Sequence, residues 1–182
     1  MTTTLSLIQT FVPLLLYPSF EYRKRLEECV FFLEEENNIA LEIFQKFIEE
    51  TKTFSTEDFE ELYTRTFDIN PVASLEIGWH LYGEQYERGA FLVTMRELLR
   101  ENAIPESTEL PDHFSYILLL IERMEHDEAT EFVNQYVFPF LEKIRVGFSE
   151  EQNPYTYLFN AIEIVLKQTF NQINKEPIYG ES

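Results

Sequence analysis

Three side chains in the middle of the sequence have a spacing that could hold a metal ion. Glu76, His80 and Glu84 follow one another in steps of four, so a helix that continued through Gly83 would place them on one face. Carboxylates and imidazoles bind iron, manganese and zinc. The spacing therefore allows a metal-dependent helical enzyme, although a polar helix face with stabilising side-chain pairs explains it as well.

A second pair, Glu122 and His126, has the same spacing but does not complete a site for two metal ions. A di-iron bundle uses Glu-x-x-His motifs on two helices together with two further carboxylates, and neither pair here has that spacing. The sequence also contains no glycine-rich phosphate loop, no Cys-x-x-Cys pair and no His-Glu-x-x-His motif. We therefore predict a protein that is not an enzyme and holds no metal or cofactor, with the metal-dependent enzyme as an alternative.

Two potential nucleophiles are better explained as structural residues. Ser115 lies near Asp112 and His113 but not in a Gly-x-Ser-x-Gly elbow, and Asp112 is expected to favour the start of a helix. Cys29 falls at an apolar helical position with no histidine near it in sequence, which predicts a small buried core residue. A lone cysteine forms no internal disulfide, which fits a reducing compartment.

One segment, from Tyr63 to Gly89, concentrates side chains suited to binding a peptide. It contains the only tryptophan, Trp79, and three of the five glycines. Glycine lets another backbone approach closely, and tryptophan and tyrosine supply a large contact area with a polar end. The mixture suits a peptide groove, while a tightly packed helix crossing explains it equally well.

Helical periodicity dominates the remainder of the chain and must position these residues. We find no strand-like alternation and no internal repeat, so we predict an all-α, single-domain bundle of eight or nine helices over 1–174, with 175–182 as a flexible tail. We expect a first core helix in Leu5–Tyr17 bent by Pro13, a helix opened by Pro18–Ser19 and interrupted at Asn37–Asn38, and a helix with Ser55 as its N-cap. A long helical region should then start at Asn70–Pro71, break near Gly83 and run to about Asn102, followed by a loop over Ala103–Leu110. Further helices should start at Pro111–Asp112 and Asn153–Pro154, with a kink at Pro139 between them.

Charge limits the partners of this chain. Its 33 acidic and 14 basic residues give a net charge of −19, which repels nucleic acid and anionic membranes and favours cationic partners. The same charge could serve solubility alone. The apolar stretch Leu5–Tyr17 lacks a basic flank and is too short to span a bilayer, so we expect a cytoplasmic protein with no stable membrane insertion.

Four short runs occur in an order that resembles the NarJ/TorD family of molybdoenzyme assembly chaperones, especially its NarJ-like branch. They are Glu61–Asp68, Gly78–Glu84, Arg88–Gly89 and Glu109–His113, the last containing a Pro-Asp-His element. The resemblance implies an all-helical chaperone for enzymes of the dimethyl sulfoxide reductase superfamily. Such a chaperone binds the apo catalytic subunit, often at its N-terminal signal or remnant signal, until the molybdenum cofactor is inserted.

Carried over by position, the resemblance implies a set of peptide-contacting residues. Their carboxylates could accept two hydrogen bonds from an arginine, and their aromatic rings could stack on it. A generic acidic interaction module remains a further alternative, and both a monomer and a dimer remain open. The implied peptide-binding residues are Asp68, Trp79, His80, Tyr82, Glu84, Arg88, Asp112 and His113.

Overall fold

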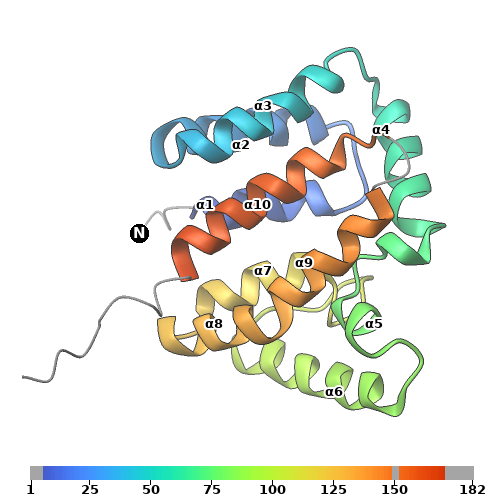
Figure 1. Ribbon diagram of the computed structural model, residues 1–182, viewed down its shortest axis with the longest axis vertical. Helices are drawn as coiled ribbons and strands as arrows, with labels where there is room; N and C mark the ends of the chain where they lie inside the picture. Colours follow the sequence, from blue (N-terminus) through green and yellow to red (C-terminus); the bar gives the residue numbers. More distant parts are fainter. Residues whose placement is uncertain (1–5, 149–151, 171–182) are drawn as a thin grey trace, which may run out of the picture.

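The computed structural model describes residues 6–148 and 152–170, and these residues are built of helices (Figure 1). Their only β pairing is an isolated bridge between Glu76 and His113. The elements are α1 (Leu7–Phe11), η1 (Val12–Leu15), α2 (Tyr22–Glu36), α3 (Asn38–Glu50), α4 (Thr56–Tyr63), η2 (Thr64–Asp68), η3 (Pro71–Ala73), α5 (Ile77–Tyr82), α6 (Tyr86–Glu101), α7 (Phe114–Arg123), α8 (His126–Phe132), η4 (Val133–Val137), α9 (Phe138–Ile144), η5 (Arg145–Phe148) and α10 (Tyr155–Phe170). The all-α prediction is confirmed, and α8, η4 and α9 together form one continuous bent rod.

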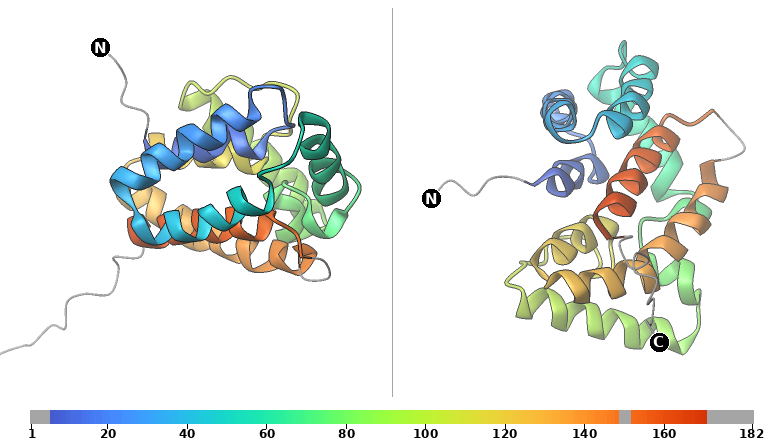
Figure 2. Two further views of the ribbon diagram at one scale, coloured as in Figure 1. Left: turned by 90° about the horizontal axis from the view of Figure 1, so that it is seen from above. Right: turned by 60° about the vertical axis from the view of Figure 1, so that its left-hand side comes forward.

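Helix α10 runs through the middle of the molecule. It packs against α3 on one side and against α8 and α9 on the other (Figures 1 and 2). Its start is the predicted one, because the Asn153 side chain accepts a hydrogen bond from the Tyr155 N–H at 3.0 Å. The predicted inward residues are all buried, which places this helix in the shared core: Tyr155, Leu158, Phe159, Ile162, Leu166 and Phe170.

Local capping signals set several other helix ends as predicted. The Asn37 side chain accepts from the Ala40 N–H at 3.0 Å and so separates α2 from α3. Ser55 and Asp58 form a reciprocal capping box at the start of α4. Such caps each stabilise a helix by about 1 kcal/mol.

Both predicted proline effects are found. Pro13 lies in the first turn of η1, the 3-10 turn that ends the first helical segment. Pro139 lies in the first turn of α9, directly after the π-helical turn η4. Proline has no N–H to donate and needs space for its ring, so a widened turn before it keeps the rod continuous.

The long helical region predicted from Pro71 to Asn102 is broken twice rather than once. The expected break is present, because α5 ends at Gly83, whose φ of 58° is a left-handed conformation that glycine adopts readily. An unpredicted break falls at 74–76, where the chain is extended and pairs with the loop before α7. That loop also runs three residues further than predicted, to His113, since α7 begins at Phe114 and not at Pro111–Asp112.

Cys29 is a buried core residue, as predicted. Its Sγ accepts a hydrogen bond from the Thr10 hydroxyl at 3.5 Å, and burial raises the pKa of the thiol to about 12. The thiolate needed for catalysis is therefore strongly disfavoured.

No helix among the described residues is both long and apolar enough to cross a membrane. The tail predicted at 175–182 lies outside the described residues, and the domain boundary at 174 stays a prediction.

Candidate functional site

A cavity of about 370 Å³ opens where η2, η3, α5 and the loop before α7 meet, and we call it the Trp79 pocket. Four of the eight residues predicted from the resemblance line it: Asp68, Trp79, Arg88 and His113. The other lining residues are Tyr63, Phe67, Ile69, Pro71, Ser74, Leu75, Glu76 and Glu109.

Two backbone hydrogen bonds hold the walls of the pocket together. The Ile77 N–H donates to the Asp112 carbonyl at 3.1 Å, and the Phe114 N–H donates to the Leu75 carbonyl at 2.9 Å. This antiparallel bridge joins the start of α5 to the loop before α7. It brings Trp79 and His113, which are far apart in sequence, to one cavity.

Asp112 holds the start of α5 in place and does not line the pocket. Its side chain is fully buried, and Oδ2 accepts a hydrogen bond from the Gly78 N–H at 2.8 Å. Its Oδ1 has no hydrogen-bond partner among the described residues. Burial and the nearby Glu76 carboxylate raise the pKa of Asp112 to about 6 although the Gly78 bond lowers it. The carboxylate therefore supports the site from within the fold.

His113 is buried, neutral and oriented by the start of α7. Its Nδ1 accepts the Ser115 N–H at 3.3 Å and lies 2.7 Å from the Ser115 hydroxyl, so the remaining proton belongs on Nε2. Burial lowers the pKa of His113 to about 4. Nε2 lies 3.9 Å from the Glu109 carboxylate at the pocket. Because Ser115 is itself buried, this pair caps a helix and does not present a nucleophile.

The titrations of Asp112 and His113 oppose each other, which gives a first prediction. Folding raises the pKa of Asp112 from its ordinary value of 3.8, so the protonated carboxyl contributes stability that is fully present below pH 3.8. This contribution is lost as the pH rises through about 6. Folding lowers the pKa of His113 from its ordinary value of 6.5, so the neutral imidazole contributes stability that is fully present above pH 6.5. This contribution is lost as the pH falls through about 4. Between these limits the two contributions partly cancel.

Asp112→Asn should therefore reveal the pH dependence of the unfolding free energy that His113 alone produces. Between about pH 6.5 and 4.5 we expect the variant to lose on the order of 2 kcal/mol more unfolding free energy than the unmodified protein. Urea unfolding across this pH range measures it, with the exposed Glu34→Gln as the matched control. Parallel pH profiles for all three proteins would contradict the assignment.

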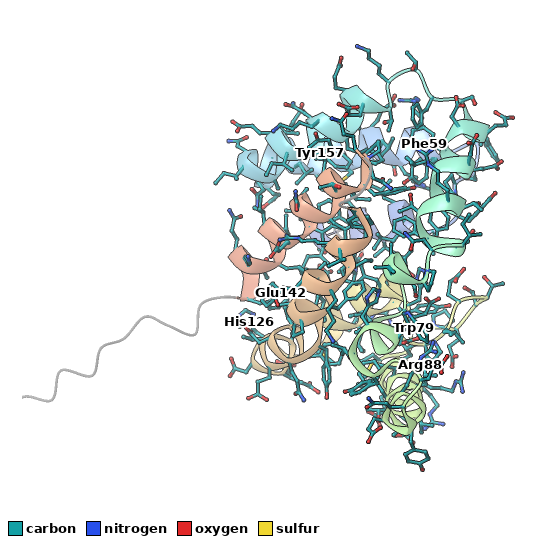
Figure 3. All side chains as sticks on the ribbon, turned by 45° about the vertical axis from the view of Figure 1, so that its right-hand side comes forward. Phe59, Trp79, Arg88, His126, Glu142 and Tyr157 are labelled. Atoms are coloured by element: carbon teal, nitrogen blue, oxygen red, sulfur yellow. The ribbon has the colours of Figure 1, made fainter. Side chains whose placement is uncertain are left out.

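Trp79 and Arg88, which both line the pocket, lie next to each other (Figure 3). The Trp79 indole N–H donates to the Pro71 carbonyl at 2.9 Å, which fixes the ring against η3. The Arg88 guanidinium carbon lies 5.3 Å from the centre of that ring, a cation–π contact. Its Nε is buried without a hydrogen-bond partner among the described residues. The indole face thus already accepts one guanidinium group.

Three carboxylates, from Asp68, Glu76 and Glu109, give the pocket an excess of negative charge. None forms a salt bridge with a described lysine or arginine, and Arg88 is the only basic residue in the lining that is charged when His113 is neutral. Burial and then the charge of Glu76 raise the pKa of Glu109, and burial raises that of Asp68, with Glu76 adding to it. The excess of two negative charges would be relieved by a cationic ligand.

Sequence reasoning missed Glu109 as a site residue and considered Glu76 only as a metal ligand. Glu109 begins the run Glu109–His113 and Glu76 lies two residues before the run Gly78–Glu84, but the sequence alone does not show which cavity a carboxylate faces. The bridge between Glu76 and His113 is the feature that brings them together.

The structure places His80, Tyr82 and Glu84 outside the lining of the Trp79 pocket. His80 Nε2 lies 2.7 Å from the Ser74 carbonyl, and its ring packs edge-on against Phe140, with centroids 5.1 Å apart. Tyr82 packs on Phe91 at 5.4 Å, and Glu84 is exposed beyond the end of α5. Their predicted contact with a peptide stays a prediction.

The metal-site hypothesis is wrong for the described residues. Because α5 ends at Gly83, Glu84 does not continue the face that carries His80, and Glu76 lies before the helix as its N-cap. Glu122 and His126 lie on different helices, α7 and α8. No group of three or more His, Cys, Asp or Glu side chains in the described residues could hold a metal ion.

The fold and the pocket together define an all-helical protein with a cavity lined by aromatic and acidic side chains. Comparison with known proteins identifies the family. Residues 33–161 match the family described as nitrate reductase delta subunit, and the chain belongs to that family. The resemblance to the NarJ/TorD proteins is thereby confirmed.

Named relatives agree with this assignment. The chain is 28% identical over 126 residues to a Bacillus subtilis (strain 168) protein named probable nitrate reductase molybdenum cofactor assembly chaperone NarJ, and the match covers 68% of both chains. It is 26% identical over 131 residues to the Escherichia coli (strain K12) nitrate reductase molybdenum cofactor assembly chaperone NarJ. That match covers 71% of this chain and 54% of the relative, so the chain spans about half the length of the Escherichia coli protein.

Proposed function

We propose that this chain is an assembly chaperone for a molybdenum enzyme of the nitrate reductase type. It binds the apo catalytic subunit at a cationic N-terminal signal or remnant signal segment, in the cytoplasm, until the molybdenum cofactor is inserted. The family and the names of its relatives support the chaperone role. The observation that carries the binding mode is the Trp79 pocket, where an aromatic face meets three carboxylates without salt-bridged lysine or arginine partners.

The chemistry of the pocket favours a guanidinium or ammonium group on the client. Glu76 and Glu109 can accept charge-assisted hydrogen bonds, and the neutral imidazole of His113 adds no opposing charge. The indole face of Trp79 attracts a cation, as its contact with Arg88 demonstrates. An apolar part of the client can pack on Phe67 and Ile69, which also line the cavity.

Calorimetric titration with synthetic N-terminal peptides of nearby-encoded molybdenum enzymes tests the proposal. We expect one peptide to bind with 1:1 stoichiometry, and a deletion strain to accumulate cofactor-free enzyme. Absence of binding to every peptide, together with normal enzyme maturation in the deletion strain, would refute the chaperone proposal.

The same titration carries a second prediction, a dependence on pH. A bound cation favours the charged forms of Asp68 and Glu109, whose pKa values are raised in the free protein, so binding releases protons. Affinity should therefore fall as the pH is lowered from neutral toward the ordinary pKa range of carboxyl groups, about 4. Buffers with different ionisation enthalpies measure the released protons. Asp68→Asn/Glu109→Gln should abolish most of the pH dependence, and an unchanged profile in that variant would contradict this origin.

A further inference from the structure

A second cavity adjoins the Trp79 pocket along α4, and we call it the α4 pocket. Its volume is about 410 Å³. Ile69 lines both cavities, and Tyr17 of the second stacks edge-on against Tyr63 of the first, with ring centroids 5.5 Å apart. The α4 pocket is lined by Tyr17, Glu57, Glu60, Glu61, Thr64, Arg65 and Ile69.

The two cavities adjoin at Ile69 and at the Tyr17–Tyr63 contact, and we call the surface that they form together the groove. Tyr17 is 53% exposed and Ile69 is 72% exposed, which leaves two large apolar side chains open to solvent where the cavities meet. Helices α4 and α5 carry the two ends of the groove on the same side of the molecule, as the positions of Phe59 and Trp79 show (Figure 3). The groove therefore has the form of an apolar strip between two polar ends.

The charges of the α4 pocket resemble those of its neighbour. Glu57, Glu60 and Glu61 form no salt bridge with a described lysine or arginine, and Arg65 is the one basic residue in the lining. Both ends of the groove thus carry an excess of two negative charges.

The length of the groove follows from helix geometry. Glu57, Glu60 or Glu61, Thr64 and Asp68 are spaced by three or four residues, so they follow one face of α4 and its continuation η2. Eleven residues separate the first from the last, which is about 16 Å at 1.5 Å per residue. A client helix would cover this distance with about eleven residues, or about three turns.

We propose that the α4 pocket is a second docking subsite for the same client segment, which binds as a basic amphipathic helix. One basic side chain lies in the Trp79 pocket, and another, about three turns away, lies against Glu60 and Glu61. Apolar side chains between them cover Tyr17 and Ile69. This inference rests on the proposed chaperone function, because it assumes that the Trp79 pocket holds a cationic segment.

The test uses two designed helical peptides without tryptophan or tyrosine. The two-ended peptide has an apolar face with arginines beside it at both ends of the helix, three turns apart. The one-ended peptide is the same except that the arginines at one end are replaced by glutamine. Trp79 is the only tryptophan, so its fluorescence reports occupancy of the first pocket directly. Each peptide is titrated into the unmodified full chain, into Glu60→Gln/Glu61→Gln, and into Glu34→Gln/Glu35→Gln as a control that alters exposed α2 residues outside both cavities.

We expect Glu60→Gln/Glu61→Gln to weaken the two-ended peptide by about three- to tenfold, the effect of losing two partly exposed ion pairs. The affinity of the one-ended peptide should fall less than about twofold in this variant, and the control variant should bind each peptide with the affinity of the unmodified protein. Equal losses for both peptides in Glu60→Gln/Glu61→Gln would overturn the second subsite while leaving the chaperone proposal intact. So would a dimer that this variant disrupts, because the groove would then bind a second copy of the chain. If neither peptide binds the unmodified protein, the subsite is overturned, while the titration with the enzymes' own N-terminal peptides decides the proposed function separately.

Discussion

Gly78→Ala is expected to destabilise this protein by about 2–4 kcal/mol. A methyl group at this position would lie 2.7 Å from Asp112 Oδ2 and 2.9 Å from a ring carbon of Phe91, both closer than contact distance. Overpacking of a buried site costs about 1–3 kcal/mol, and loss of the Gly78 N–H bond to a buried carboxylate costs a similar amount. Glycine is therefore required here by close approach, since its φ is not in the left-handed region.

Gly89→Ala is the matched control for this substitution. Gly89 lies within α6, and nothing would contact its added methyl group within 4 Å. Replacing an unencumbered helical glycine stabilises by about 0.5–1 kcal/mol, so the two substitutions should shift stability in opposite directions. Chemical unfolding of both variants measures the difference. Similar stabilities would show that the contact between α5 and the loop before α7 is looser than described.

Trp79→Ala should remove most of the affinity for a cationic client segment. Aromatic residues at the centre of an interface commonly contribute about 2–4 kcal/mol, so we expect binding to weaken by about 30-fold or more. The substitution would also remove two contacts within the pocket. These are the cation–π contact between the indole ring and Arg88, and the hydrogen bond that the indole N–H donates to the Pro71 carbonyl. Calorimetry measures this, since the variant has no tryptophan fluorescence.

Two further variants separate binding from folding. Trp79→Phe keeps an aromatic face and should recover part of the affinity, because stacking on a cation does not require the indole N–H. Phe31→Ala removes an aromatic ring of α2 that is 55% exposed and lies outside the pocket, and it should leave binding unchanged. Equal affinities for Trp79→Ala and the unmodified protein, with both folded, would contradict the role of the indole.

The parts of the fold that were predictable depend on local signals. Asn37, Ser55 and Asn153 each cap the helix that follows, and the apolar stripe of α10 appears in its sequence spacing. Such signals act over a few residues, so they are readable without knowledge of the tertiary structure. Pro139 and Gly83 mark a kink and a break for the same reason.

The missed features depend on contacts between distant segments. Asp112 was expected at the start of its own helix, but it accepts from Gly78, 34 residues earlier. This contact and the neighbouring bridge accompany the break in the predicted helix at 74–76, where the Ser74 hydroxyl also accepts a hydrogen bond from the Glu76 N–H at 3.3 Å. They also decide which carboxylates face the pocket, which explains why Glu109 was overlooked.

Site-specific photo-crosslinking would test the central claim most directly. A photoreactive phenylalanine analogue at Ile69, which is exposed between the two cavities, would be compared with the same group at Phe31 on α2. Incubated with the apo catalytic subunit, the Ile69 position is predicted to form a covalent adduct that mass spectrometry locates in the cationic N-terminal segment, while the Phe31 position yields none. An adduct only from Phe31, or one mapped away from the client's N-terminal segment, would contradict the account.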